Sequence, residues 1–129
     1  MFNPTDAFSS FSVNDLAQAK AFYGQTLGLQ IEEQAGMGLQ LHLPGGGVVF
    51  VYPKPDHTPA TFTLLNFRVA NIEAAVDELV RRGVAFEHYD NVEGARTDAK
   101  GIARDARFPA TAWFKDPAGN FLALGENAG

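Results

Sequence analysis

Two segments of this chain repeat each other, and this repeat limits the possible folds more than any other feature. Residues 8–16 read FSSFSVNDL and residues 64–72 read LLNFRVANI, a shift of 56 positions that carries Asp15 onto Asn71. In each copy alternating apolar residues, typical of a strand, lead to an Asx residue, and a helical apolar stripe follows. Self-similarity of this kind indicates that one supersecondary module occurs twice.

The two helical stripes carry start and stop signals. Asp15 and Asn71 are good N-caps, because a short side-chain oxygen can accept hydrogen bonds from the free amides of a first helical turn. Gly28 and Gly83 lie where each helix is expected to end. The strands predicted next are residues 29–33 and 84–89.

A second repeat has a larger shift of 73 positions, from residues 44–51, PGGGVVFV, to residues 117–124, PAGNFLAL. Pro-Gly turn chemistry joins two strands as a hairpin in each half. The strands before these turns are predicted at residues 39–43 and 111–115. The extra residues of the second half lie in Asn91–Pro109, which is polar and contains glycine, and we predict a loop there.

Each half therefore reads strand, helix, strand, strand, strand. A chain of 129 residues has the length of one domain. We predict a single α+β domain over residues 1–129, with module one at about 6–53 and module two at about 61–126. The linker at 53–60 contains three prolines.

Composition excludes several classes of function. The chain has no cysteine, so it can form neither a disulfide nor a thiolate metal site. Its net charge is −5 and its basic residues form no cluster larger than Arg81-Arg82, so we expect no nucleic-acid binding. No apolar run is long enough to span a membrane, and the N-terminus lacks the features of a secretory signal. We therefore expect a cytoplasmic protein without a membrane partner.

Two motifs resemble a known superfamily. The segments V-x-D-L-x-x-A-x-x-F-Y-x-x-x-L-G, from Val13 to Gly28, and W-F-K-D-P-A-G-N, from Trp113 to Asn120, are similar to hallmarks of the vicinal oxygen chelate superfamily. It includes glyoxalase I, bleomycin-resistance proteins, fosfomycin-resistance enzymes and extradiol dioxygenases. The resemblance implies that the two βαβββ modules form a curved mixed sheet, with helices on the convex face and a ligand on the concave face. It also implies a homodimer.

The resemblance further implies where a metal would be held. In the family's enzymes four His or Glu side chains bind a divalent ion, and those positions correspond here to Phe8, Phe50, Leu64 and Ala123. None of these side chains has a nitrogen, oxygen or thiolate ligand atom. The histidines, His42, His57 and His88, are scattered without the spacing of a metal motif. We therefore expect no metal and no cofactor.

Strand alternation predicts which side chains face the concave side. The predicted ligand-binding residues are Phe8, Ser10, His42, Phe50, Tyr52, Leu64, Asn66, Arg68, Trp113, Phe121 and Ala123. An apolar, aromatic surface with a few polar groups is typical of sites for organic ligands. We expect an aromatic or planar part of a ligand to contact the aromatic rings, and Arg68 or His42 to bind its polar end.

Each of these assignments has an alternative. The aromatic rings could instead fill the cavity as core residues. Arg68 could bind a carboxylate or phosphate, or form a salt bridge at the rim. The charged residues of the long second-module loop could form a lid or a solvated surface; they are Asp98, Lys100, Arg104, Asp105 and Arg107.

Three functions compete. The first is a metal-free protein that binds a small organic molecule, to sequester it or to give resistance to it. The second is a glyoxalase-like lyase, isomerase or dioxygenase with atypical residues, for which His42, Tyr52 and Lys115 are the acid–base candidates. The third is a protein-interaction module with a vestigial cavity. The residues leave the identity of the ligand open.

Overall fold

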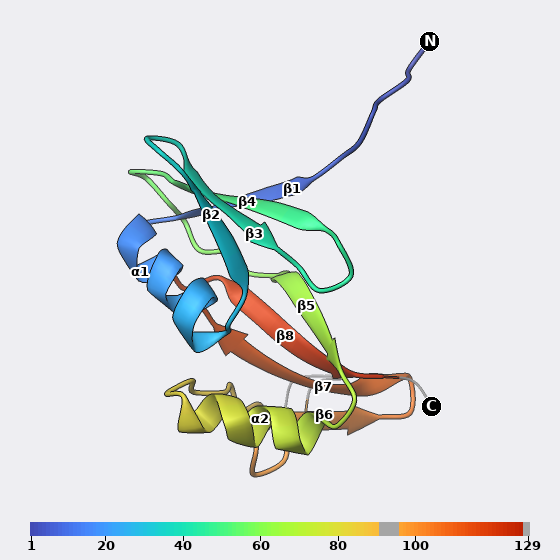
Figure 1. Cartoon of the computed structure of the whole chain (residues 1–129). Coiled ribbons are helices and arrows are strands. Elements are labelled where there is room, and N and C mark those ends of the chain that lie inside the picture. The colour runs from blue at the N-terminus through green and yellow to red at the C-terminus, as the bar shows by residue number, and fades with distance from the viewer. Residues whose placement is uncertain (91–95, 128–129) are drawn as a thin grey trace. The chain divides into compact units, whose positions relative to one another are not determined.

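The computed structural model describes residues 1–90 and 96–127, and its elements confirm the α+β class with two βαβββ modules (Figure 1). The chain divides into two compact units, Met1–Thr58 and Pro59–Gly129, each holding one module. The single domain expected over residues 1–129 stays a prediction.

The elements of module one are β1 (Ser9–Val13), α1 (Leu16–Lys20), η1 (Ala21–Thr26), β2 (Gln30–Gln34), β3 (Gly38–His42) and β4 (Val48–Pro53). Those of module two are β5 (Thr63–Val69), α2 (Ile72–Arg81), β6 (Ile102–Asp105), β7 (Phe108–Lys115) and β8 (Phe121–Glu126).

Each module has its own four-stranded mixed sheet. The strand orders, β1-β4-β3-β2 and β5-β8-β7-β6, are the same when the strands of each module are counted from its beginning. The first strand of each module pairs in parallel with the last, and the other pairs are antiparallel. The repeat in the sequence is therefore a repeat in topology, as predicted.

The caps predicted for both helices are present. The Asp15 carboxylate accepts a hydrogen bond from the Gln18 amide at 3.0 Å, and the Asn71 side-chain oxygen accepts one from the Ala74 amide at the same distance. The first helical segment differs from the expectation in one respect, because its second half, η1, is a π-helix. A π-helix closes its hydrogen bonds over one more residue per turn.

One face of each sheet is covered by its helix and forms the core. In module one α1 packs against β3, and in module two α2 packs against β7 and β8. The buried strand residues of the two covered faces are Val13, Leu39, Leu41, Val49 and Val51 in module one, and Leu65, Ile102, Ala112, Phe114, Leu122 and Leu124 in module two. Since successive strand residues point to opposite faces, the alternate residues form an open face in each module.

Two predictions about the second module were wrong. Asn91–Pro109 was predicted to be a loop, but among its described residues lie β6 and the first residues of β7. The strand predicted at 84–89 is reduced to one bridge, between Phe86 and Phe114. Both errors have one cause, which is the pairing of β7. Its first half, from Phe108 to Ala112, pairs with β6, so only the last part of β7 is left to pair with residues 84–89.

None of the helices in residues 1–90 and 96–127 is long and apolar enough to cross a membrane.

Candidate functional site

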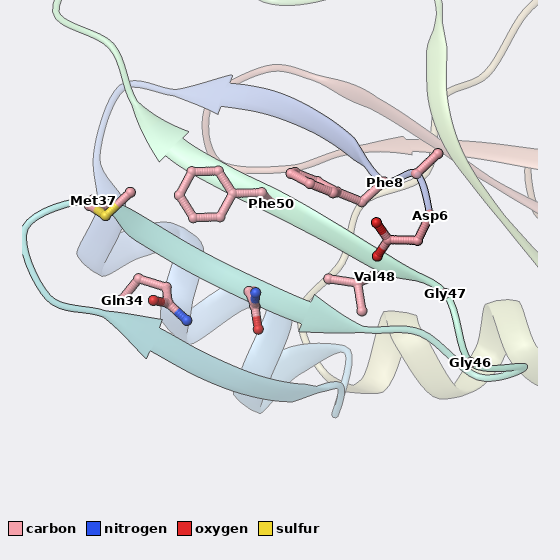
Figure 2. Close-up of a pocket in the computed structure, with 10 residues that line it drawn as sticks. Asp6, Phe8, Gln34, Met37, Gly46, Gly47, Val48 and Phe50 are labelled. Atoms are coloured by element: carbon pink, nitrogen blue, oxygen red, sulfur yellow. The ribbon is translucent and has the colours of Figure 1, made fainter. Parts of the chain in front are cut away.

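The open face of module one contains a hollow of about 560 Å³ (Figure 2). The residues that line it are Asp6, Ala7, Phe8, Gln34, Met37, Gln40, Gly46, Gly47, Val48 and Phe50. This volume lies within the range of small-molecule sites, roughly 300–1,000 Å³. Two predicted site residues, Phe8 and Phe50, are thus brought together. Phe8 is 66% exposed, so within this module it does not fill the hollow as a core residue would.

The lining combines apolar walls with a few polar groups. In Figure 2 the side chains of Phe8, Gln34, Met37 and Phe50 project from the same side of the sheet, and Asp6 lies at one end. Among the described residues, the polar side chains that line the hollow are one carboxylate and two amides, with no lysine, arginine or histidine. Aromatic and thioether groups supply large, polarisable contact area, and amides can fix the orientation of a ligand.

Gly38 shapes this hollow from the next strand. A Cβ atom at this position would lie 2.9 Å from Phe50 Cζ and 2.2 Å from the Val51 carbonyl oxygen. The absence of a side chain therefore lets the Phe50 ring lie over β3. The Phe50 ring also stacks on Tyr52, with ring centroids 6.3 Å apart. Phe50 is thereby held from two sides on the open face.

The other predicted residues of module one lie on the same face but outside the lining of the hollow. Ser10 pairs with Phe50 across β1 and β4 and is exposed. Ser12, next on that face, is hydrogen-bonded to His57 Nδ1 at 2.7 Å, which ties the segment after β4 to this end of the sheet. His42 Nε2 is buried, has no hydrogen bond to a described residue and lies 3.7 Å from Glu32 Oε2.

Module two presents a second aromatic group on its open face. Trp113 contacts Tyr89 edge to face, with ring centroids 5.9 Å apart. The Lys115 ammonium lies 5.0 Å above the centre of the Phe121 ring and 3.9 Å from Glu87 Oε1. Burial, with a smaller effect of the charge of Glu87, raises the pKa of the Tyr89 phenol. Trp113 and Phe121, both predicted site residues, thus share one face.

The first strand of module two contains a register shift that alternation alone does not predict. Thr63 pairs with Phe121 and Leu65 with Leu122, so Leu64 is passed over in the pairing. Beyond the shift, Asn66 pairs with Ala123 and Arg68 with Gly125, as the alternation predicts. Arg68 and Asn66 lie at a smaller hollow of about 400 Å³, with Phe67, Pro109, Thr111, Gly125 and Glu126.

Two of the basic residues considered as a lid, Lys100 and Arg104, form ion pairs with helix α2 of module two, and Arg107 pairs with Asp105. Lys100 Nζ lies 2.8 Å from Asp77 on α2, and Arg104 lies 3.2 Å from Glu73 on the same helix. Hydrogen bonds donated by Arg107 lower the pKa of the Asp105 carboxyl to about 2. These contacts correspond to the alternative of a charged surface, and the described part of the loop shows no lid.

Several residues of the two hollows were missed by sequence reasoning. Asp6 precedes β1, and Met37 lies in the turn before β3, where strand alternation makes no prediction. Gln34 lies on β2, and its pairing with Gly38 places it on the open face. Thr111 and Gly125 lie in the same row as Arg68. Under the repeat shift of 73 they correspond to positions on β3 and β4 of module one, so the repeat could have indicated them.

The positions that correspond to the family's metal ligands do not fit a metal. Phe8, Phe50, Leu64 and Ala123 have hydrocarbon side chains. In the described part of the chain no group of three or more His, Cys, Asp or Glu side chains could hold an ion.

We therefore predict that the protein purified without added metal contains no stoichiometric divalent ion. Elemental analysis should find far less than one zinc, iron, nickel or manganese per chain, and a chelator should leave the melting temperature unchanged. About one tightly held transition metal per chain would contradict this expectation.

Comparison with known proteins gives a sequence-family match and several similar structures. The model of the Glyoxalase/Bleomycin resistance protein/Dioxygenase superfamily matches residues 7–124. A search of curated proteins found no match. One similar solved structure is that of TnmS3, described as an antibiotic binding protein from Streptomyces sp. CB03234. Its sequence is 24% identical to this chain, its TM-score is 0.69, and the match covers 98% of this chain and 100% of that one.

Two further structures have the same fold. A superfamily member from Sphaerobacter thermophilus is 22% identical with a TM-score of 0.69, covering 95% of this chain and 98% of that one. A lactoylglutathione lyase from Agrobacterium tumefaciens is 20% identical with a TM-score of 0.64, covering 96% and 95%. At these identities the structures show a common fold and leave the chemistry open.

Proposed function

The chain belongs to the Glyoxalase/Bleomycin resistance protein/Dioxygenase superfamily, and from this premise we propose that it is a metal-free protein that binds a small organic molecule with a planar apolar part. The observation that carries the proposal is the hollow on the open face of module one, where aromatic and thioether side chains meet two amides. Binding of this kind would let the protein sequester its ligand or confer resistance to it. One protein of similar fold, TnmS3, is described as antibiotic binding, which is compatible with such a role.

The hydrophobic lining decides which kind of molecule fits. Phe8 and Met37 are 66% and 64% exposed and line the same hollow as Phe50, and grouped exposed apolar side chains of this kind mark binding surfaces. A flat ligand lying against Phe8 and Phe50 would remove this apolar surface from water, at about 25 cal/mol for each Å² buried. The amides of Gln34 and Gln40 would then bind polar substituents of the ligand.

The experiment begins with a thermal-shift screen of planar organic molecules, since a ligand selective for the folded protein raises its stability. For any hit we predict that Phe50→Leu weakens binding about fivefold, because an aromatic contact contributes about 1 kcal/mol beyond buried area. Titration calorimetry on both proteins measures this ratio.

Phe11→Leu is the matched control. Phe11 is on the neighbouring strand but on the covered face, where its ring lies 5.9 Å from that of Tyr23. The control should lower stability without changing the ligand's affinity for the folded protein. Equal affinities of Phe50→Leu and the unmodified protein, or equal losses in the two variants, would place the ligand elsewhere.

The enzyme alternative has less support in the described residues. Of the acid–base candidates, Lys115 is placed between Glu87 and the Phe121 ring. His42 Nε2 is 3.7 Å from Glu32 Oε2, which is longer than a hydrogen bond. The homodimer implied by the resemblance stays a prediction.

A further inference from the structure

The open face of module two has a row of residues across three strands at the smaller hollow. Arg68 on β5 pairs with Gly125 on β8, and Gly125 pairs with Thr111 on β7. The next row is Asn66, Ala123 and Trp113. Paired residues on neighbouring strands project to the same side of a sheet. The central strand thus contributes only glycine and alanine, while the strands beside it contribute larger side chains.

The space above Gly125 is open. A Cβ atom built at this position would meet no other atom within 4 Å, and the surrounding hollow measures about 400 Å³. The backbone of β8 therefore forms the floor of a depression beside the Arg68 side chain. A small group of atoms can lie there without displacing any described side chain.

Arg68 differs from nearly all the other basic side chains of this protein. Lys20, Lys54, Arg81, Arg82, Lys100, Arg104, Arg107 and Lys115 all form ion pairs with carboxylates. Arg68 and Arg96 form none with the residues that the structure describes, although the chain has fifteen acidic residues. The rim salt bridge considered for Arg68 from the sequence is thus absent from the described residues.

The polar neighbours of Arg68 leave its charge available. Glu126 also lines this hollow. One oxygen of its carboxylate, however, accepts a hydrogen bond from the Ile72 amide at the start of α2, the helix that covers the other face of the sheet. The Thr111 hydroxyl donates to the Pro109 carbonyl at 2.7 Å. Asn66, like Arg68, is exposed and makes no hydrogen bond with its side chain to a described residue. The donors left for a ligand are therefore a guanidinium and an amide on one strand.

We infer that this hollow binds the oxyanion of a small aromatic molecule, a carboxylate or a phosphate, through Arg68 and Asn66. A guanidinium binds a carboxylate or a phosphate group through two parallel charge-assisted hydrogen bonds, which are stronger than those to a neutral ligand. Trp113, one row away on the same face, offers a ring against which the aromatic part can lie. This inference rests on the proposed function, that an open face of a module binds small molecules.

Three small aromatic probes test this assignment: benzoate, its neutral isostere benzamide, and phenyl phosphate. Binding is measured by amide chemical shifts in NMR titrations of the full chain. The oxyanions should bind at least about tenfold more tightly than benzamide, and the largest shifts should include the amides of Asn66, Arg68 and Gly125. The stronger of the two oxyanions shows whether the hollow prefers a carboxylate or a phosphate.

Two variants locate the site. Arg68→Met keeps an unbranched apolar stem and removes the charge, and it should reduce the affinity for the two oxyanions to about that for benzamide. Gly125→Val fills the open space from a position with no positive φ, so it should weaken all three probes without unfolding the sheet. Thermal unfolding verifies that each variant remains folded.

Arg96→Met is the control for net charge, because it removes a second arginine that has no described ion pair. Equal losses of oxyanion affinity in the Arg68 and Arg96 variants would overturn the inference, because they would show a non-specific effect of charge. Equal binding of benzoate and benzamide would also overturn it, but would leave the proposed function intact. Failure of all three probes and of every planar molecule in the screen would overturn both.

Discussion

Replacing Gly38 by alanine should destabilise the protein by about 3 kcal/mol or more. Gly38 has a φ of +156°, a backbone conformation that residues with a side chain rarely adopt. A methyl group there would also lie 2.2 Å from the Val51 carbonyl oxygen on the neighbouring strand. Backbone strain and forced overpacking each cost about 1–3 kcal/mol, and both apply at this position. Denaturant unfolding of the two proteins measures the difference.

Gly36→Ala provides the matched control two residues away. Its φ is +75°, so alanine is strained there as well, but a Cβ atom would meet nothing within 4 Å. We expect a loss of about 1–2 kcal/mol, which is the cost of the left-handed conformation alone. If the two variants lost the same stability, the close approach of β3 to β4 would not limit residue 38.

Asp116→Ala should have a comparable effect, again about 3 kcal/mol or more. The buried Asp116 carboxylate accepts hydrogen bonds from the amides of Ala118 and Asn120 and from the Asn120 side chain. Asn120, also buried, then accepts from the Ala60 amide. Each buried donor that loses its partner costs about 1–3 kcal/mol. Thermal or denaturant unfolding tests the prediction.

A second turn in the same module has the same two backbone hydrogen bonds to its aspartate but is exposed to solvent. The Asp98 carboxylate accepts from the amides of Lys100 and Ile102, at the same spacings as in the turn of Asp116. Its side chain is 44% exposed, so water can replace the carboxylate. Asp98→Ala should therefore cost only about 1 kcal/mol. A loss as large as that of Asp116→Ala would show that burial is not the cause of the larger effect.

The D-P-x-G-N motif illustrates how a sequence hallmark relates to structure. From the sequence it indicated a family and a hairpin turn. The structure shows a physical reason for its residues: an aspartate that binds the amides of the turn, and an asparagine that joins the turn to residue 60. The motif is therefore explained by folding alone, and no function need be assigned to it.

The errors in module two have a common origin. The segment Ile102–Asp105 has neither the length nor the clear alternation of an independent strand, and it becomes β6 only by pairing with β7. Residues 84–89 have a better strand pattern, yet only Phe86 bridges to that partner. Which of two segments occupies the edge of a sheet depends on the partner strand, and no local pattern records that.

Local sequence patterns predicted the module, its duplication, the helix caps and the face of most strand residues, with the exceptions of Leu64 at the register shift and of the unpredicted strand β6. These follow from local rules, because the side-chain period of a strand and the capping of a helix depend on neighbouring residues. Other features appeared only in the tertiary structure. These are the position of the hollows on the open faces and the room that Gly38 leaves for Phe50. The ion pairs of Lys100 and Arg104 with α2, and the lack of a described acidic partner for Arg68, are of the same kind. Cavities and ion pairs depend on side chains from strands and helices far apart in the chain, so they are set only when those elements pack together.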